Sequence, residues 1–276
     1  MSIVHNIIGK RPIDMSKIDT FVSNIDGAIC ENRGEGTYHF WIDGKSTRGF
    51  EITLERDSIE VRNMVLSNRY DYELTNKIVT KILSLTDGII LNEDEEKRTH
   101  YPIFDNDRIT ETEIQDCECI CVLSKENDVA ICGPIRNVHF GKRMHKEFES
   151  LKGEQLKNKI FDLILTVNYQ LPFFEPSGIM RVSSPENEGK EKIMKFLSEE
   201  TDYILSKYDY ILLHNPDNSE KPIMVTNEIL NTILPPNWTL IDEYTVVAPG
   251  ISQSVWRKLL TNAEKYDLWE NFINKK

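Results

Sequence analysis

The chain has 276 residues, of which 39% are hydrophobic and 28% charged, and its formal net charge is -12. This apolar fraction is too high for a disordered chain, and at about 150 residues per domain the length predicts two domains or one large one. The excess of acidic residues argues against nucleic acids and anionic membranes as partners, because both are bound chiefly through Lys and Arg.

The N-terminal third predicts a β-β-β-α-β unit that begins near residue 37. Residues 1–36 are weakly patterned apart from one short run of apolar residues at helical spacing. Asp43-Gly44 is a strong hairpin signal, and Gly88 marks a helix end. The predicted elements are a helix over 15–25, strands at 38–42, 49–54 and 59–65, a helix over 71–88 with Asp71 as N-cap, and a strand at 89–91.

An acidic block follows this unit. Residues 93–118 contain ten acidic and three basic side chains. The difference, 10 − 3 = 7 negative charges, is more than half of the net charge of -12. A dense charge block with few apolar residues is usually a solvated loop. We therefore predict an N-terminal subdomain over 1–92, an acidic connector over 93–116 and a C-terminal subdomain over 117–276.

The second half predicts a further mixture of strands and helices. A polar turn at 124–128 separates two apolar runs and indicates a hairpin. Gly153 is a break within a long helical pattern, and Ser252 is an N-cap residue before the last helix. The predicted elements are strands at 119–123, 129–132 and 135–140, a helix over 144–168, a strand at 179–182, a helix over 189–207, strands at 210–213 and 222–225, a short helix over 227–234, a long strand over 238–247 and a final helix from 252.

Together these elements predict an α+β fold of antiparallel meanders with packed helices, divided into two subdomains. The pattern N-x-I-x-x-x-I-L recurs at 76–83, 158–165 and 227–234. It indicates either a repeated strand–helix unit or the ordinary spacing of Ile on helix faces. The copies are 82 and 69 residues apart, and this unequal spacing favours the second explanation.

The cysteines bear on compartment and on metal binding. There are five, an odd number, and Cys117, Cys119 and Cys121 lie close together with Cys132 across the predicted hairpin. This is not the pattern of a secreted disulfide framework. On a strand, successive same-face side chains lie about 6.5–7 Å apart, too far for three sulfurs at about 2.3 Å from one zinc ion. We expect a structural strand face, no metal and no cofactor.

Neither a membrane span nor a secretory leader is expected from the sequence. A span needs about 20 mostly apolar residues, and the longest uncharged stretch, 163–174, is short and contains polar residues. The first residues lack the basic-then-apolar order of a signal peptide. We therefore predict a cytoplasmic protein that binds no membrane.

A basic segment from Gly133 to Lys146 stands out in this acidic chain. It runs from a predicted strand into a predicted helix start, where backbone N–H groups and basic side chains bind anions. Its glycine spacing is too long for a phosphate-binding P-loop. The alternative is a solvated loop that pairs with the acidic block. The candidate anion-binding residues are Arg136, His139, Lys142 and Arg143.

No catalytic signature such as G-x-S-x-G or G-x-G-x-x-G is present. The leading hypothesis is therefore a binding module without catalysis of its own, such as an inhibitor, an immunity-type antidote or a regulatory adaptor. Its acidic residues Glu93, Asp94, Glu95 and Glu96 would engage a basic protein partner. The alternative is an enzyme or small-ligand binder that acts on an anionic substrate at Arg136–Lys146. The sequence does not indicate the oligomeric state.

Overall fold

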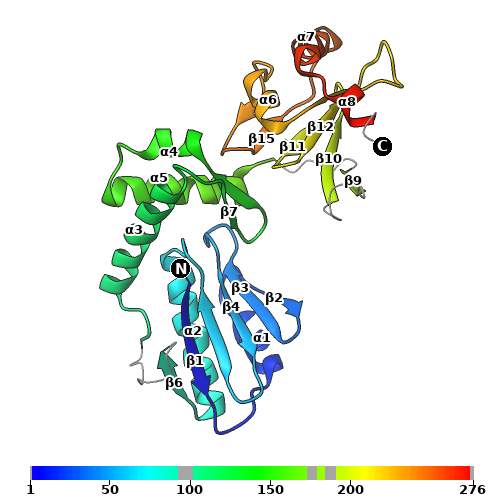
Figure 1. Ribbon diagram of the computed structural model, residues 1–276. Coiled ribbons are helices and arrows are strands. Elements are labelled where there is room, and N and C mark those ends of the chain that lie inside the picture. Colours follow the sequence, from blue (N-terminus) through cyan, green and yellow to red (C-terminus); the bar gives the residue numbers. More distant parts are fainter. Residues whose placement is uncertain (1, 93–101, 173–178, 184–190, 274–276) are drawn as a thin grey trace. The chain divides into compact units, whose positions relative to one another are not determined.

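The structure is a computed structural model, and it describes residues 2–92, 102–172, 179–183 and 191–273 (Figure 1). The chain divides into two compact units, Met1–Gln170 and Leu171–Lys276. Both combine antiparallel strand pairs with helices, which confirms the α+β class. The division falls at residue 170, whereas the sequence places a connector at 93–116.

A six-stranded antiparallel sheet is the framework of the first unit, in the order β2-β3-β4-β5-β1-β6. The predicted meander is confirmed as β3, β4 and β5. No strand is predicted in residues 1–36, but β1 and β2 lie there and flank the meander. The strands are β1 (Ile3–Ile8), β2 (Ala28–Gly34), β3 (Thr37–Ile42), β4 (Phe50–Leu54), β5 (Ile59–Asn63) and β6 (Ile89–Asn92).

Helices α1 (Met15–Val22) and α2 (Arg69–Thr86) pack on one face of this sheet, and Figure 1 shows α2 running along it. Alternate strand residues such as Phe40, Ile52 and Val61 point into this core and are fully buried. On β4 and β5 every second residue is therefore buried, on the side that the helices cover.

A buried polar cluster joins the β3–β4 turn to the start of α2. The N-cap of α2 is Asn68 and not Asp71, because Asn68 and Asp71 form a capping box. Asp71 is fully buried, and its carboxylate accepts hydrogen bonds from the hydroxyl of Thr47 and from the backbone N–H of Arg48 and Gly49 at 3.0–3.1 Å. One carboxylate thus fixes both the helix start and the turn.

Helix α3 (Asn106–Leu123) corrects two expectations at once. Residues 106–116 are helical and not a solvated connector, while residues 93–101 lie outside the described part of the chain. The predicted strand at 119–123 is also helical. Cys117 and Cys121 are one helical turn apart and buried, and Cys119 is exposed. The cysteines at every second position therefore do not lie on one face of a strand, as the sequence predicts, but on a helix.

The remainder of the first unit is a hairpin followed by helices. Strands β7 (Val129–Cys132) and β8 (Asn137–Phe140) confirm two of the predicted strands, but the hairpin predicted between 119–123 and 129–132 is wrong, because β7 pairs with β8. Gly153, with φ +52°, separates two helices as predicted. These helices are α4 (Lys142–Phe148) and α5 (Gly153–Leu165), and a π-helical turn, η1 (Thr166–Gln170), ends the unit.

The second unit contains a four-stranded sheet in the order β13-β12-β10-β9 and a three-stranded sheet in the order β11-β15-β14. Strands β10 and β12 are parallel, and the other neighbours are antiparallel. The strands are β9 (Ile179–Ser183), β10 (Glu191–Leu197), β11 (Tyr203–Leu205), β12 (Tyr210–Leu213), β13 (Ile223–Val225), β14 (Thr239–Leu240) and β15 (Val246–Ala248). The helical elements are α6 (Asn227–Thr232), α7 (Gln253–Ala263), η3 (Glu264–Tyr266) and α8 (Trp269–Ile273).

Two predictions in this unit are wrong. The helix expected over 189–207 is replaced by two strands, β10 and β11, which lie in different sheets. Strand β10 is buried on both faces, since Leu197 packs in one apolar cluster and Met194 in another, so its sequence lacks alternation. The long strand expected over 238–247 is split by a turn in which Asp242 accepts hydrogen bonds from the N–H of Tyr244 and Thr245.

Candidate functional sites

The predicted acidic site divides between described and undescribed residues. Glu93, Asp94, Glu95 and Glu96 lie outside the described part of the chain. The rest of the acidic block lies on α3, where its side chains face in two directions. Glu113 is buried, and Asp116 is half-buried, whereas Asp107, Glu111 and Glu118 are exposed.

The inward acids of α3 hold the loop between β5 and α2. The carboxylate of Glu113 accepts a hydrogen bond from the backbone N–H of Arg69 and lies 3.3 Å from the ammonium of Lys157. Asp116 accepts from the backbone N–H of Leu66 at 2.8 Å. Leu66 is fully buried at φ +65°, a strained conformation for a residue with a side chain. These two acids are therefore part of the fold, and burial raises the pKa of both.

Three outward acids, Asp107, Glu111 and Glu118, together with Val122 form what we call the outer stripe of α3. At 100° per residue they fall within about 60° of one another around the helix, and they extend over about 22 Å. Val122 is 69% exposed and its neighbour Leu123 is 44% exposed. In the described part of the chain, none of the three acids forms an ion pair. The stripe thus combines free negative charge with an exposed apolar end.

The four candidate anion-binding residues have four different environments. The guanidinium of Arg136 donates to the carbonyl oxygens of Val167 and Asn168 at 3.2 and 3.4 Å. Arg136 is thus held by η1, the π-helical turn that ends the first unit. His139 is buried on β8, with 7% of its surface exposed. Lys142 is exposed at the start of α4, and Arg143 lies 3.6 Å from Glu147 on the same helix.

The neighbouring His145 also has a structural position. Its Nδ1 donates a hydrogen bond to the carbonyl oxygen of Cys121 at 2.7 Å, and its Nε2 lies 3.4 Å from Glu149. This histidine therefore ties α4 to the C-terminal turn of α3. The basic segment is held mostly by contacts within its own unit.

All five cysteines are free thiols. Burial raises the pKa of the Cys117 and Cys121 thiols, and it raises the pKa of Cys30 to about 12. Such thiols stay protonated at neutral pH and are poor nucleophiles. Within the described ranges, no group of three or more His, Cys, Asp or Glu side chains is placed to hold a metal ion. No described helix is long and apolar enough to cross a membrane.

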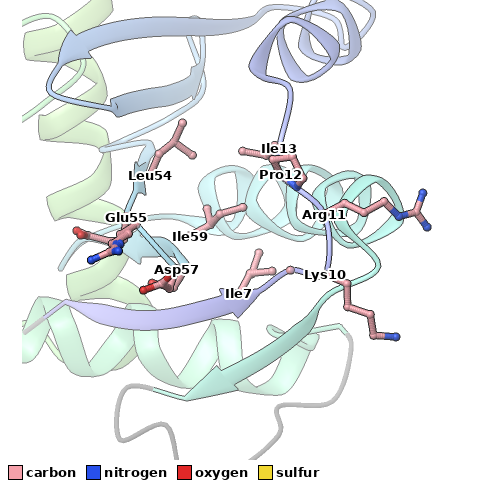
Figure 2. Close-up of a pocket in the computed structure, with 12 residues that line it drawn as sticks. Ile7, Lys10, Arg11, Pro12, Ile13, Leu54, Glu55, Asp57 and Ile59 are labelled. Carbon is pink, nitrogen blue, oxygen red and sulfur yellow. The ribbon is translucent and has the colours of Figure 1, made fainter.

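A pocket of about 430 Å³ lies at one end of the six-stranded sheet (Figure 2). One wall is the loop between β1 and α1, residues 9–13, and the other is the β4–β5 turn, residues 54–58. Ile7 and Ile59 are cross-strand partners beneath it, and both are core residues that are only 0% and 6% exposed. Ile13 and Leu54 are half-buried and complete the apolar lining.

Charged residues lie on opposite sides of this apolar lining. In Figure 2, Glu55 and Asp57 lie on one side of the isoleucines, and Lys10 and Arg11 extend from the loop on the other. Lys10 is 3.1 Å from Asp87 in an exposed ion pair. Such a pair contributes little energy. The β4–β5 turn also contributes Arg56 to the lining, so both signs of charge occur on that side of the pocket.

The sequence pattern did not reveal this pocket. Its walls are 41 or more residues apart in sequence and meet only because β1 pairs with β5. The run Gly9-Lys10-Arg11-Pro12 after an apolar segment is a turn signal with two bases. It could have identified one wall, but the segment was taken as weakly structured.

Residues 16–166 match the family described as a domain of unknown function, DUF4299. The chain belongs to this family. No curated protein and no solved structure matches the chain. The DUF4299 match runs from α1 to the start of η1 and includes the outer stripe of α3. Of the two pocket walls it includes only the β4–β5 turn, because residues 9–13 precede it.

Proposed function

We propose that this protein is a cytoplasmic binding module, without catalysis of its own, that engages a basic protein partner through the outer stripe of α3. The observation that carries the proposal is the alignment of Asp107, Glu111 and Glu118 on one exposed face that ends in Val122. The acidic residues Glu93–Glu96 precede this helix in sequence and belong to the same acidic block.

The composition of the stripe suits protein recognition. Exposed negative charge attracts a basic partner and speeds its association, most strongly at low ionic strength. Apolar residues such as Val122 and Leu123 supply the desolvated contacts from which most binding energy comes. A stripe of about 22 Å matches one face of a standard protein interface.

The two directions of the α3 acids make the proposal testable without unfolding the protein. Glu113 and Asp116 hold backbone groups, so substituting them would confuse folding with binding. Asp107, Glu111 and Glu118 are exposed, and exposed substitutions usually change stability by less than about 0.5 kcal/mol. A binding defect in variants of the stripe can then be assigned to the interface.

The experiment is capture of partners from the native lysate by the tagged full chain at low salt, with identification by mass spectrometry. We expect a stoichiometric basic protein that dissociates at high salt. The variant Asp107→Lys/Glu111→Lys/Glu118→Lys should weaken it about tenfold or more at low salt. Reversal of Glu93–Glu96 should weaken it in the same direction.

The matched control is the reversal of three exposed acids elsewhere, Asp26→Lys/Asp43→Lys/Glu73→Lys, which changes net charge equally. If both triple variants weaken the partner alike, overall charge and not the stripe is responsible. If neither does, or no basic protein is captured, the proposal fails. Substituting Lys142 or Arg143 by Glu tests the alternative site, and the partner's affinity should not fall in these variants.

A further inference from the structure

The turn between β7 and β8 is tied by hydrogen bonds to the segment that joins β3 to β4. The side-chain oxygen of Asn168 in η1 accepts from two backbone N–H groups of the β7–β8 turn, both at 2.9 Å. The next residue of η1, Tyr169, donates its hydroxyl to the carbonyl oxygen of Ser46 at 2.9 Å. Cys132, the last residue of β7, is therefore held near the segment that contains Arg48.

Arg48 is a buried cation that forms no ion pair with a carboxylate in the described part of the chain. Only 7% of its surface is exposed. Its guanidinium donates to the carbonyl oxygen of Val65 at 2.8 Å and to the sulfur of Met64 at 3.2 Å. Its Nε has no hydrogen-bond partner among the described residues. A buried arginine is normally neutralised by an acid, because removing a charge from water is costly. Arg48 can therefore accept one more anionic partner.

Cys132 is the ionisable side chain that acts on Arg48 most strongly. Burial lowers the pKa of Arg48, and an ionised Cys132 opposes this effect more than the carboxylates of Asp71, Glu51 or Asp116 do. Cys132 is also exposed, so a reagent in solution can reach its sulfur. The thiolate is the nucleophilic form of cysteine, and a neighbouring cation stabilises it.

We infer that Cys132 is a thiol-exchange site that forms mixed disulfides with small disulfides such as glutathione disulfide, and that Arg48 stabilises its thiolate. The Cys132 sulfur attacks one sulfur of the disulfide, whose S–S bond breaks. A new S–S bond joins Cys132 to one glutathione, and the other glutathione leaves as a thiolate that takes up the proton released by Cys132. Cys132 is oxidised and one glutathione is reduced, and a second thiol reverses the step.

The chain contains its own controls for this inference. Cys119 is also an exposed free thiol, but it lies on the acidic helix α3 directly after Glu118. Cys117 and Cys121 are buried, and burial raises the pKa of both thiols, so their modification would report unfolding. Two exposed thiols in different electrostatic surroundings can thus be compared within one molecule.

The first experiment treats the reduced full chain with glutathione disulfide at neutral pH and locates the mixed disulfides by mass spectrometry of unreduced peptides at successive times. We expect Cys132 to be modified about tenfold faster than Cys119, because the charge of Arg48 favours the Cys132 thiolate. The same preference should appear with 2-hydroxyethyl disulfide, which is uncharged, because the thiolate and not the charge of the oxidant sets the rate. Equal rates at the two thiols overturn the inference. A preference confined to the charged disulfide also overturns it, because attraction of the oxidant would then explain the result.

The second experiment tests the guanidinium itself. Arg48→Gln keeps a hydrogen-bond donor and removes the charge, so it should slow Cys132 about tenfold and leave Cys119 unchanged, and Arg48→Lys should restore most of the rate. Arg62→Gln removes the same charge from an exposed position on β5 and should change neither rate. A Cys132 rate that Arg48→Gln does not change overturns the inference. If this variant unfolds, which modification of Cys117 would report, the comparison of Cys132 with Cys119 by the uncharged disulfide still decides. Partner capture through α3 does not depend on these results.

Discussion

The ionisable side chains of the first unit fall into two groups with opposite surroundings. One group is inside: Asp71 and Glu113 are almost inaccessible to solvent and accept hydrogen bonds from backbone N–H groups. The other group is the outer stripe of α3, where Asp107, Glu111 and Glu118 project into solvent. Both groups consist of carboxylates, and two of their members are separated by only one residue.

This difference teaches that charge in the sequence does not by itself indicate a solvated or functional surface. A buried carboxylate that pairs with backbone groups fixes the conformation, and its removal leaves donors unsatisfied. An exposed carboxylate contributes little to stability and is free to meet a partner. Stability and binding should therefore respond to different substitutions, and four predictions test this separation.

The largest loss of stability is expected for Asp71→Ala. It leaves the N–H groups of Arg48, Gly49 and Asn68 without their acceptor, whereas the hydroxyl of Thr47 keeps the Leu66 carbonyl oxygen. Unsatisfied buried groups and the lost capping box together should cost about 3–5 kcal/mol. Urea denaturation followed by circular dichroism measures the free energy of unfolding. The exposed neighbour Glu73→Ala is the control and should stay within about 0.5 kcal/mol of wild type.

His5 should give the next largest effect, through pH. Burial first, and the charge of Arg108 second, lower the pKa of His5 from 6.5 to about 4. Between these two pH values the unfolded chain binds a proton that the folded chain does not. Stability from this group is therefore complete above pH 6.5 and falls as the pH decreases, by about 3 kcal/mol at pH 4.

The test compares wild type with His5→Phe, which keeps an aromatic ring beside Phe104. The variant should lose about 3 kcal/mol less than wild type between pH 7 and pH 4, because other titrating groups contribute equally to both. Equal slopes in the two proteins would mean that His5 is not held neutral inside the fold.

The burial of one or both faces of an element also explains which parts of the fold could be predicted from the sequence. Strands β4 and β5 bury every second residue, which gives the alternation that indicates a strand, whereas β3 is buried on both faces and is indicated by the Asp43-Gly44 turn that follows it. Strand β1 was missed because its alternation is broken by the buried polar residue His5. Strand β10 was taken for a helix because both its faces are covered, as the positions of Met194 and Leu197 show.

Helix α3 was missed for a related reason. Glu113 and Asp116 point inward, so the buried face of the helix reads as charged in the sequence. Cysteines at every second position have the spacing of residues on one face of a strand, and this spacing led to a strand prediction. Only the partners Lys157, Arg69 and Leu66, all distant in sequence, make a buried face with these acids stable. No local pattern contains that information.

The candidate sites show the same limit. The acidic block was recognised, but the sequence could not separate its inward from its outward members. Arg136 is a candidate anion-binding residue from the sequence, and its guanidinium donates to the carbonyl groups of Val167 and Asn168. The pocket was not found because its walls meet through the pairing of β1 with β5. Sites built across strands depend on topology, which composition and spacing do not give.

An intermediate effect is expected for the Glu113–Lys157 pair. Its atoms are 3.3 Å apart, and the two side chains are 4% and 13% exposed. Glu113→Gln should cost about 1–3 kcal/mol, because Lys157 loses a charged partner and the Arg69 N–H keeps only a neutral acceptor. A double-mutant cycle with Lys157→Met isolates the coupling. A coupling energy near zero would show that Glu113 acts through the Arg69 N–H alone.

The smallest change in stability is expected for the outer stripe, and this prediction decides whether the separation holds. The triple variant Asp107→Lys/Glu111→Lys/Glu118→Lys should unfold within about 1 kcal/mol of wild type, because these side chains form no ion pair in the described part of the chain. Asp107 lies in the first turn of α3, where an acid is favoured, so most of any loss should come from that site. A loss of several kcal/mol would mean that the stripe is covered in the folded protein. A protein of wild-type stability that no longer retains its partner would assign the stripe to binding alone.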